Sequence, residues 1–217
     1  MTTASEPRTV EIGPQRLQGL MGLPENPKGL VIFAHGSGSG RLSPRNNYVA
    51  AALRKAGLAT LLLDLLTPAE ERDRRNVFDI PLLAGRLLLA TDWAAARADT
   101  CRLSVGYFGA STGGGAALVA AAEPGARVAA VVSRGGRPDL AGPALAHVRA
   151  PVLLIVGGLD GPVIGMNRDA LAQLRTEKEL VIVPGAGHLF EEPGTLDQVV
   201  DHAIRWFLAH LLPLSEN

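Results

Sequence analysis

Hydrophobic residues occur in this chain as short uninterrupted runs, separated by stretches in which they recur every three or four positions. Uninterrupted runs rich in β-branched residues predict strands that are buried on both faces, as in a parallel sheet. The first two runs, residues 9–13 and 17–24, are joined near Gly13-Pro14 and predict an antiparallel pair. Six further strands are predicted at residues 29–35, 58–65, 103–110, 128–136, 151–158 and 179–188.

The stretches between these strands predict helices, because their apolar residues fall on one helical face. The predicted helices span residues 47–57, 80–98, 114–123 and 195–212. Strands that alternate with helices in this way are typical of an α/β fold. We therefore expect the α/β-hydrolase type of architecture: an eight-stranded, mostly parallel sheet flanked by helices. A large cap domain is not expected, because residues 134–150 alone separate the sixth strand from the seventh.

Composition favours a single domain over residues 1–217, with residues 1–8 and 213–217 expected to be flexible. The chain has 21 Lys and Arg against 21 Asp and Glu, so its formal net charge of zero disfavours nucleic acid or an anionic membrane as partner. A small-molecule substrate is the expected partner instead. One cysteine, Cys101, and the lack of a signal-peptide pattern predict a cytoplasmic protein.

A serine stands between glycines where a predicted strand meets a predicted helix. Residues 109–113 read Gly-Ala-Ser-Thr-Gly, which matches the pattern G-x-S-x-G. Small flanking residues let the chain turn sharply there and raise the serine oxygen above the edge of the sheet. We therefore predict that Ser111 is a nucleophile. The alternative is that a small residue is needed at this turn only for close helix packing.

A serine hydroxyl needs a base to take its proton, and that base needs a carboxylate partner. His188 follows the last predicted strand, and Asp160 follows the strand before it. The chain order Ser111, Asp160, His188 and their places at the carboxyl ends of strands predict a catalytic triad. Asp64 is the strongest rival carboxylate, and His35 is a weaker rival for the role of acid or base.

The loop after the first core strand reads His-Gly-Ser-Gly-Ser-Gly at residues 35–40. In this type of fold, a backbone N–H from such a loop and one from the residue after the nucleophile stabilise the oxyanion of the tetrahedral intermediate. We predict that Ser37 and Thr112 supply these two groups. The alternative is that the glycines only form a flexible turn.

Taken together, these motifs resemble the α/β-hydrolase superfamily, and more narrowly its small dienelactone-hydrolase-like members. The resemblance extends over residues 9–211 and rests on the strand order and on "HGSGSG", "GASTGG", "GGLD" and "GAGH". It implies a hydrolase that works through an acyl-enzyme, with His35 in the His-Gly pair that shapes the oxyanion loop. Dienelactone hydrolases proper carry a cysteine where this chain has Ser111, so the serine favours an esterase for small esters or lactones.

Two arginines are candidates for binding a negatively charged substrate group, because a guanidinium offers a planar fork suited to a carboxylate. Arg134 ends the sixth predicted strand, and Arg41 follows the oxyanion loop. The alternative for Arg134 is a structural role, either an ion pair with Asp139 or hydrogen bonds to loop carbonyls. Residues 66–80 carry mixed charges and are a candidate partial lid or a solvated helix.

Two other functions would use the same features. The glycines of residues 36–40 and Asp64 imitate a dinucleotide-binding βαβ unit, although Arg41 stands where a third glycine belongs and Pro44 interrupts the start of the helix. A catalytically silent hydrolase fold that serves as a ligand receptor would have the same pocket. No cofactor is predicted, and no metal site, because the chain lacks a His-Glu-x-x-His or paired-cysteine pattern.

Overall fold

Eight strands form one sheet in the order β1-β2-β4-β3-β5-β6-β7-β8 in the computed structural model, which describes residues 6–211. β2 pairs antiparallel with β1 and with β4, and all other neighbours are parallel. This arrangement confirms the predicted fold class. The strands are β1 (Arg8–Ile12), β2 (Leu17–Gly22), β3 (Leu30–Ala34), β4 (Ala59–Leu63), β5 (Val105–Ala110), β6 (Val128–Arg134), β7 (Val152–Gly157) and β8 (Lys178–Val183).

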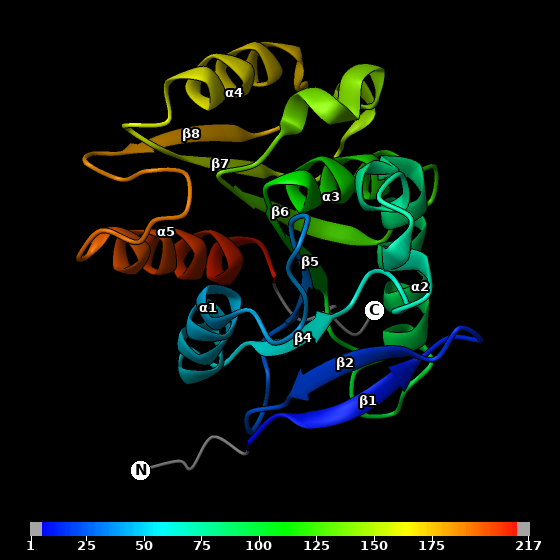
Figure 1. Ribbon diagram of the computed structural model, residues 1–217. Helices are drawn as coiled ribbons and strands as arrows, with labels where there is room; N and C mark the ends of the chain where they lie inside the picture. The colour runs from blue at the N-terminus through cyan, green and yellow to red at the C-terminus, as the bar shows by residue number, and fades with distance from the viewer. Residues whose placement is uncertain (1–5, 212–217) are drawn as a thin grey trace.

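Helices cover both faces of the sheet (Figure 1). α1 and α5 pack on one face, and α2, α3 and α4 pack on the other. The helices are α1 (Pro44–Lys55), α2 (Ile80–Ala95), α3 (Thr112–Ala122), α4 (Gly161–Gln173) and α5 (Thr195–His210). A kinked 3-10 segment at Pro138–His147 lies between β6 and β7, in place of a cap domain. None of the described helices is long and apolar enough to cross a lipid bilayer.

Several predicted boundaries differ from those of the structure, and two of the differences have a clear physical reason. α1 begins at Pro44 rather than at residue 47, because the Ser43 side chain caps the helix and proline fits its first position. Arg8 is not part of a flexible end, because it opens β1 and forms an ion pair with Asp99 at 2.5 Å. Of the other residues predicted to be flexible, residues 1–5 and 213–217 lie outside the described part of the chain.

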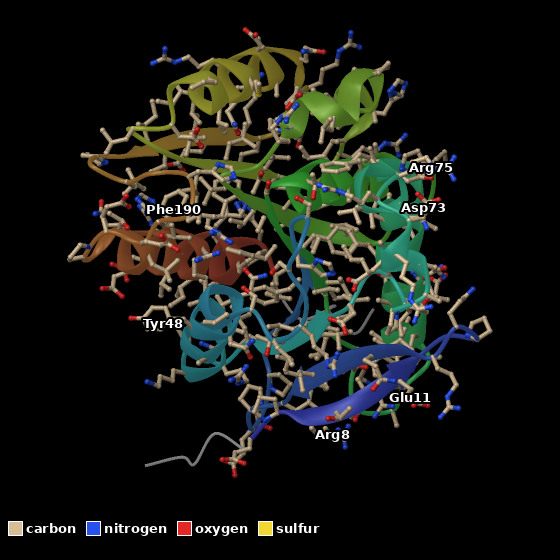
Figure 2. The ribbon with its side chains drawn as sticks, in the orientation of Figure 1. Arg8, Glu11, Tyr48, Asp73, Arg75 and Phe190 are labelled. Carbon is tan, nitrogen blue, oxygen red and sulfur yellow. The ribbon has the colours of Figure 1, made fainter. Side chains whose placement is uncertain are left out.

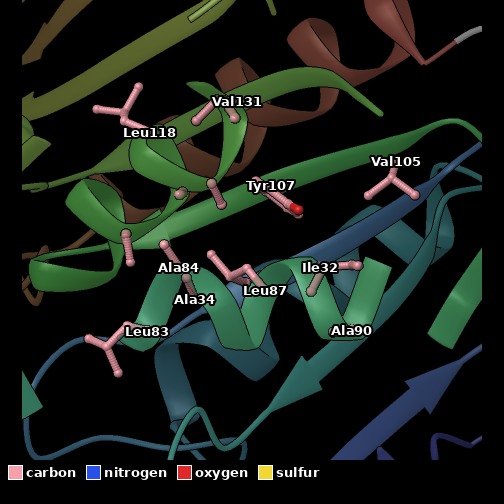
Figure 3. Close-up of a cluster of buried hydrophobic side chains, with 14 of the residues drawn as sticks. Ile32, Ala34, Leu83, Ala84, Leu87, Ala90, Val105, Tyr107, Leu118 and Val131 are labelled. Atoms are coloured by element: carbon pink, nitrogen blue, oxygen red, sulfur yellow. The ribbon is translucent and has the colours of Figure 1, made fainter. Parts of the chain in front are cut away.

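α2 packs its apolar face on the centre of the sheet (Figure 3). Leu83, Leu87 and Ala90 of this helix are buried together with Ile32 of β3. Tyr107 of β5 is also fully buried in this cluster, and its hydroxyl forms a 2.7 Å hydrogen bond with Thr91. Burial raises the pKa of Tyr107 to about 12, so the ring stays neutral and packs as part of the core.

The candidate lid, residues 66–80, is neither a long helix nor a free loop. It forms two short 3-10 turns, Glu70–Arg72 and Asn76–Phe78. Glu70 holds the segment down: its carboxylate accepts a hydrogen bond from the Thr67 amide at 2.8 Å and pairs with Arg86 of α2 at 2.5 Å. The Asp73–Arg75 pair of the same segment lies at the surface (Figure 2).

We expect Glu70→Gln to destabilise the protein by about 1–2 kcal/mol, because it leaves the buried Arg86 guanidinium without a charged partner. Partial burial raises the pKa of Glu70, but hydrogen bonds from Thr67 and Arg86 outweigh it and lower the pKa below the usual 4.5. The stabilisation is therefore present above about pH 4.5 and is lost as the pH falls further. Thermal unfolding of both proteins from pH 3 to pH 7 measures it, and Asp73→Asn in the exposed pair is the matched control.

Candidate active site

Ser111 lies at a sharp turn between β5 and α3. Its backbone has φ 52° and ψ −122°, a conformation that side chains of L-residues rarely adopt. Glycine at position 113 is required by close approach, because a Cβ there would lie 2.6 Å from the carbonyl oxygen of His35. The Ser111 carbonyl accepts hydrogen bonds from the amides of Gly114 and Arg137, each at 3.0 Å. The strained turn is thus fixed by the loops around it, as predicted for a nucleophile elbow.

Asp160 and His188 meet at the carboxyl ends of β7 and β8. The Nδ1 atom of His188 lies 2.6 Å from Oδ2 of Asp160. Asp160 occupies the N-cap position of α4, yet its carboxylate makes no capping hydrogen bond and binds the imidazole instead. A carboxylate on Nδ1 requires the proton on that atom, so we assign the neutral ring a free lone pair on Nε2.

The two loops that carry these residues are tied to each other by backbone hydrogen bonds. The Gly158 amide donates to the Val183 carbonyl at 2.8 Å, and the Leu159 amide donates to the Ala186 carbonyl at 2.9 Å. On the other side of the imidazole, the Gly187 amide donates to the Glu192 carboxylate at 3.0 Å and lowers the pKa of that carboxyl. The position of the histidine therefore depends on a network rather than on one contact.

His35 fixes the predicted oxyanion loop. Its Nε2 accepts a hydrogen bond from the Leu65 amide at 3.0 Å, which leaves the proton on Nδ1 to be donated to the Gly36 carbonyl at 2.9 Å. Within the described part of the chain, no protein acceptor binds the backbone N–H of Ser37 or of Thr112. His35 thus links β4 to the loop as a neutral ring, and both predicted donors stay available for an oxyanion.

Two adjoining cavities lie at this edge of the sheet. Ser111 and His188 line one of about 220 Å³, together with Arg134. Thr112 lines the other, of about 280 Å³, and Ser37 lines both. The structure therefore brings together all five predicted residues of the triad and the oxyanion hole, Asp160 through its contact with His188.

The two candidate arginines differ in their surroundings. Arg134 is 6% exposed, lines the cavity of Ser111, and donates from Nη2 to Asn46 at 3.3 Å. Burial and the neighbouring Arg45 guanidinium lower the pKa of Arg134 to about 10. Its predicted ion pair with Asp139 is wrong, because Arg137 holds that carboxylate with bonds of 2.8 and 2.7 Å.

Arg41 lines neither of these two cavities. It binds Asp64 through both its guanidinium and its backbone amide. Asp64 is thus paired with Arg41, whereas the carboxylate partner of His188 is Asp160. In a dinucleotide-binding unit, the carboxylate of Asp64 would bind a ribose hydroxyl, but in this structure it is paired with Arg41.

Sequence reasoning missed Arg45 and Asn46, which line the cavity of Ser111. Both lie in the first turn of α1, and Asn46 is 2% exposed. The signal that could have found them is Ser43-Pro44, a capping residue followed by a proline at the first helical position. No group of three His, Cys, Asp or Glu side chains suited to a metal ion occurs in residues 6–211.

Known proteins resemble this chain over most of its length. A crystal structure of a dienelactone hydrolase from Anabaena variabilis is 60% identical, with a TM-score of 0.91 over 95% of this chain and 100% of that one. A putative phosphoribosyl transferase of Mycobacterium tuberculosis is 61% identical over 93% of this chain, which spans only 46% of that relative. A probable 2-oxo-3-(5-oxofuran-2-ylidene)propanoate lactonase of a Bradyrhizobium species is 31% identical over 66% of each.

The sequence model of the dienelactone hydrolase family matches residues 17–206. That range runs from the start of β2 into α5 and includes the elbow, the oxyanion loop, Asp160 and His188. The chain therefore belongs to the dienelactone hydrolase family.

Proposed function

We propose that this protein is a serine hydrolase that cleaves small carboxylic esters or lactones through an acyl-enzyme. Ser111 is the nucleophile, His188 the base, and Asp160 the carboxylate that orients the base. The observation that carries the proposal is one cavity shared by a strained serine and by a histidine whose Nδ1 is held by a carboxylate at 2.6 Å. Membership of the dienelactone hydrolase family supports the same reaction class.

The geometry supports a two-step reaction. Nε2 of His188 accepts the Ser111 proton while Oγ attacks the carbonyl carbon, and the charge that develops on the carbonyl oxygen is stabilised by the amides of Ser37 and Thr112. The imidazolium then donates its proton to the leaving alcohol oxygen. A water molecule, activated by the same histidine, cleaves the acyl-enzyme and returns Ser111 to its free form.

The name of the mycobacterial relative describes a protein about twice as long, since this chain spans 46% of it. The lactonase name of the Bradyrhizobium relative supports a cyclic ester as one substrate form. Serine in place of cysteine at the elbow extends the proposal to open-chain esters.

Labelling with a fluorophosphonate tests the proposal directly. We expect a single adduct, mapped by mass spectrometry to Ser111, because Ser111 alone among the serines that line the two cavities has the strained backbone of a nucleophile elbow. Labelling should block turnover of a panel of p-nitrophenyl esters and small lactones in proportion to the adduct formed. An active protein that keeps its turnover after complete labelling, or that is labelled on Ser37 or Ser39 instead, would contradict the proposed mechanism.

A further inference from the structure

Two further cavities lie at the edge of the sheet opposite to Ser111. Val105 and Val128, the first residues of β5 and β6, line one of them. The other is lined by the loops that lead into β7 and β8, the next two strands of the sheet (Figure 1). β5 has six residues and ends directly before Ser111, so roughly 20 Å separate the two edges. These cavities are therefore separate from the candidate active site.

The first cavity, of about 330 Å³, presents mainly carbon to a ligand. More than half of its lining residues are alanine, valine or leucine, among them Leu103 and Val105. Thr91 and Thr100 also line it, but both are buried and their hydroxyls already donate to carbonyls of α2 at 2.9 and 2.6 Å. This cavity therefore suits an aliphatic chain, which needs no hydrogen bonds.

The second cavity is a basic groove of about 790 Å³. Arg149 and Arg175 line it, and Glu123 is the one carboxylate among its described lining residues. The hydroxyl of Thr176 donates to the Arg149 carbonyl at 2.8 Å and ties the two loops that carry the arginines. No carboxylate among residues 6–211 forms an ion pair with either arginine. The charge of the groove therefore favours an anion.

The apolar cavity and the basic groove adjoin, because Ala126 and Val128 line both. Arg127 lies between these two residues in the chain, and it lines the apolar cavity. Its ion pair with Asp92 is 3.7 Å long, and the two side chains are 73% and 76% exposed. An exposed pair of this length contributes little to stability, so a ligand can replace Asp92 at low cost. A third guanidinium is thus available where the two cavities meet.

We propose that these two cavities form one binding site for a single-chain amphiphile, an aliphatic chain that ends in a phosphate group. The chain occupies the apolar cavity, and the phosphate binds Arg127, Arg149 and Arg175. Three guanidinium groups against one carboxylate favour a head group with more than one negative charge, which a phosphate monoester carries near pH 7. The site lies apart from Ser111, so this proposal does not depend on ester hydrolysis.

Calorimetric titration with three probes tests both halves of the site. Octyl phosphate, below the concentration at which it forms micelles, is compared with 1-octanol and with inorganic phosphate. We expect one octyl phosphate to bind per chain, with a Kd about tenfold or more below that of either other probe. The reason is that octanol lacks the charge-assisted contacts and inorganic phosphate leaves the apolar cavity unfilled.

Cys101 provides a readout at the site itself. Its thiol is exposed, it lines the apolar cavity, and it is the one cysteine of the chain. We expect saturating octyl phosphate to slow the alkylation of Cys101 by iodoacetamide by about tenfold, because a bound chain covers the thiol. Octyl phosphate that binds without protecting Cys101 overturns the proposal.

Three variants test the named side chains. Combined Arg149→Met and Arg175→Met should raise the Kd of octyl phosphate about tenfold or more and leave that of octanol unchanged. Arg168→Met is the matched control, because Arg168 is an exposed arginine of α4 that lines neither cavity. Ala126→Phe fills the junction of the two cavities and should weaken the binding of octyl phosphate, while the labelling of Ser111 stays unchanged.

Other results would overturn the proposal. Equal affinity for octyl phosphate and inorganic phosphate shows that no chain is bound, and equal affinity for octyl phosphate and octanol shows that no phosphate is bound. Arg134→Met tests binding in the candidate active site: loss of octyl phosphate binding there, with binding kept in the double variant, assigns the probe to the wrong cavity.

Two alternative occupants are distinguished in the same way. Vesicles of phosphatidylcholine and phosphatidic acid present the same head group on a membrane, and a protein that binds them but not dissolved octyl phosphate overturns the proposal. A Cys101 thiol that reacts only after dilution has dissociated a dimer shows that a second copy of the chain covers the site, and this also overturns it.

Discussion

Ser111→Ala is expected to lower kcat for every ester and lactone substrate by about 10⁴-fold or more, because no acyl-enzyme can form without the hydroxyl. KM should change little, since the hydroxyl is a small part of the cavity that Ser111 lines and the two oxyanion amides belong to other residues. Pre-steady-state measurements with an excess of p-nitrophenyl acetate should lack the burst of p-nitrophenol that the proposed acyl-enzyme predicts for the native protein. Circular dichroism before and after substitution should be unchanged.

Ser111→Gly distinguishes the loss of the hydroxyl group from the effect of backbone strain at the same position. The positive φ of 52° is unfavourable for alanine and serine and accessible to glycine. We therefore expect the glycine variant to be as inactive as the alanine variant. Its unfolding temperature should be higher than that of the alanine variant, corresponding to a free energy of unfolding larger by about 1 kcal/mol. Wild-type turnover in either variant would exclude Ser111 as the nucleophile.

The strands were predictable because both of their faces are buried. Each parallel strand from β3 to β7 appears in the sequence as a largely apolar run. β8 is more exposed, and residues 178–183 still read as a strand through their β-branched residues. The triad prediction rested on the G-x-S-x-G pattern, on the chain order and on the places of Asp160 and His188 directly after strands, because parallel strands end at one edge of the sheet.

α4 was not predicted, and its burial explains why. Only Val163, Asn167 and Ala170 are buried along its 13 residues. One of the three is polar: the Asn167 side chain donates to the carbonyl oxygens of Gly136 and Val163 at 3.1 and 2.8 Å. The buried amide interrupts the apolar face of the helix, so hydrophobic periodicity gives only a weak signal for it.

The partners of Arg134 could not be predicted from the sequence for a different reason. Which side chains can form an ion pair depends on the path that the chain takes after them. Gly135-Gly136 changes the direction of the chain directly after Arg134. Gly135 has a φ of 51°, and Asp139 is consequently within reach of Arg137 but not of Arg134. Asn46, the partner that Arg134 has instead, lies 88 residues away in the chain.

Asp160→Asn is expected to lower kcat by about 10³- to 10⁴-fold while KM stays close to its native value. An asparagine side chain can donate a hydrogen bond to Nδ1 of His188. The proton of the neutral ring then moves to Nε2, and the ring can no longer accept the Ser111 proton. The imidazolium that forms during attack also loses its 2.6 Å carboxylate partner.

Asp64→Asn is the matched control, because Asp64 also follows the end of a core strand and was the strongest rival for this role. Its carboxylate binds Arg41, so we expect the substitution to weaken that contact and to change kcat less than tenfold, within about 1.4 kcal/mol. Steady-state kinetics with one p-nitrophenyl ester at a pH above the histidine range compares the two variants. A loss in Asp64→Asn as large as that in Asp160→Asn would transfer the orienting role to Asp64 and contradict the triad.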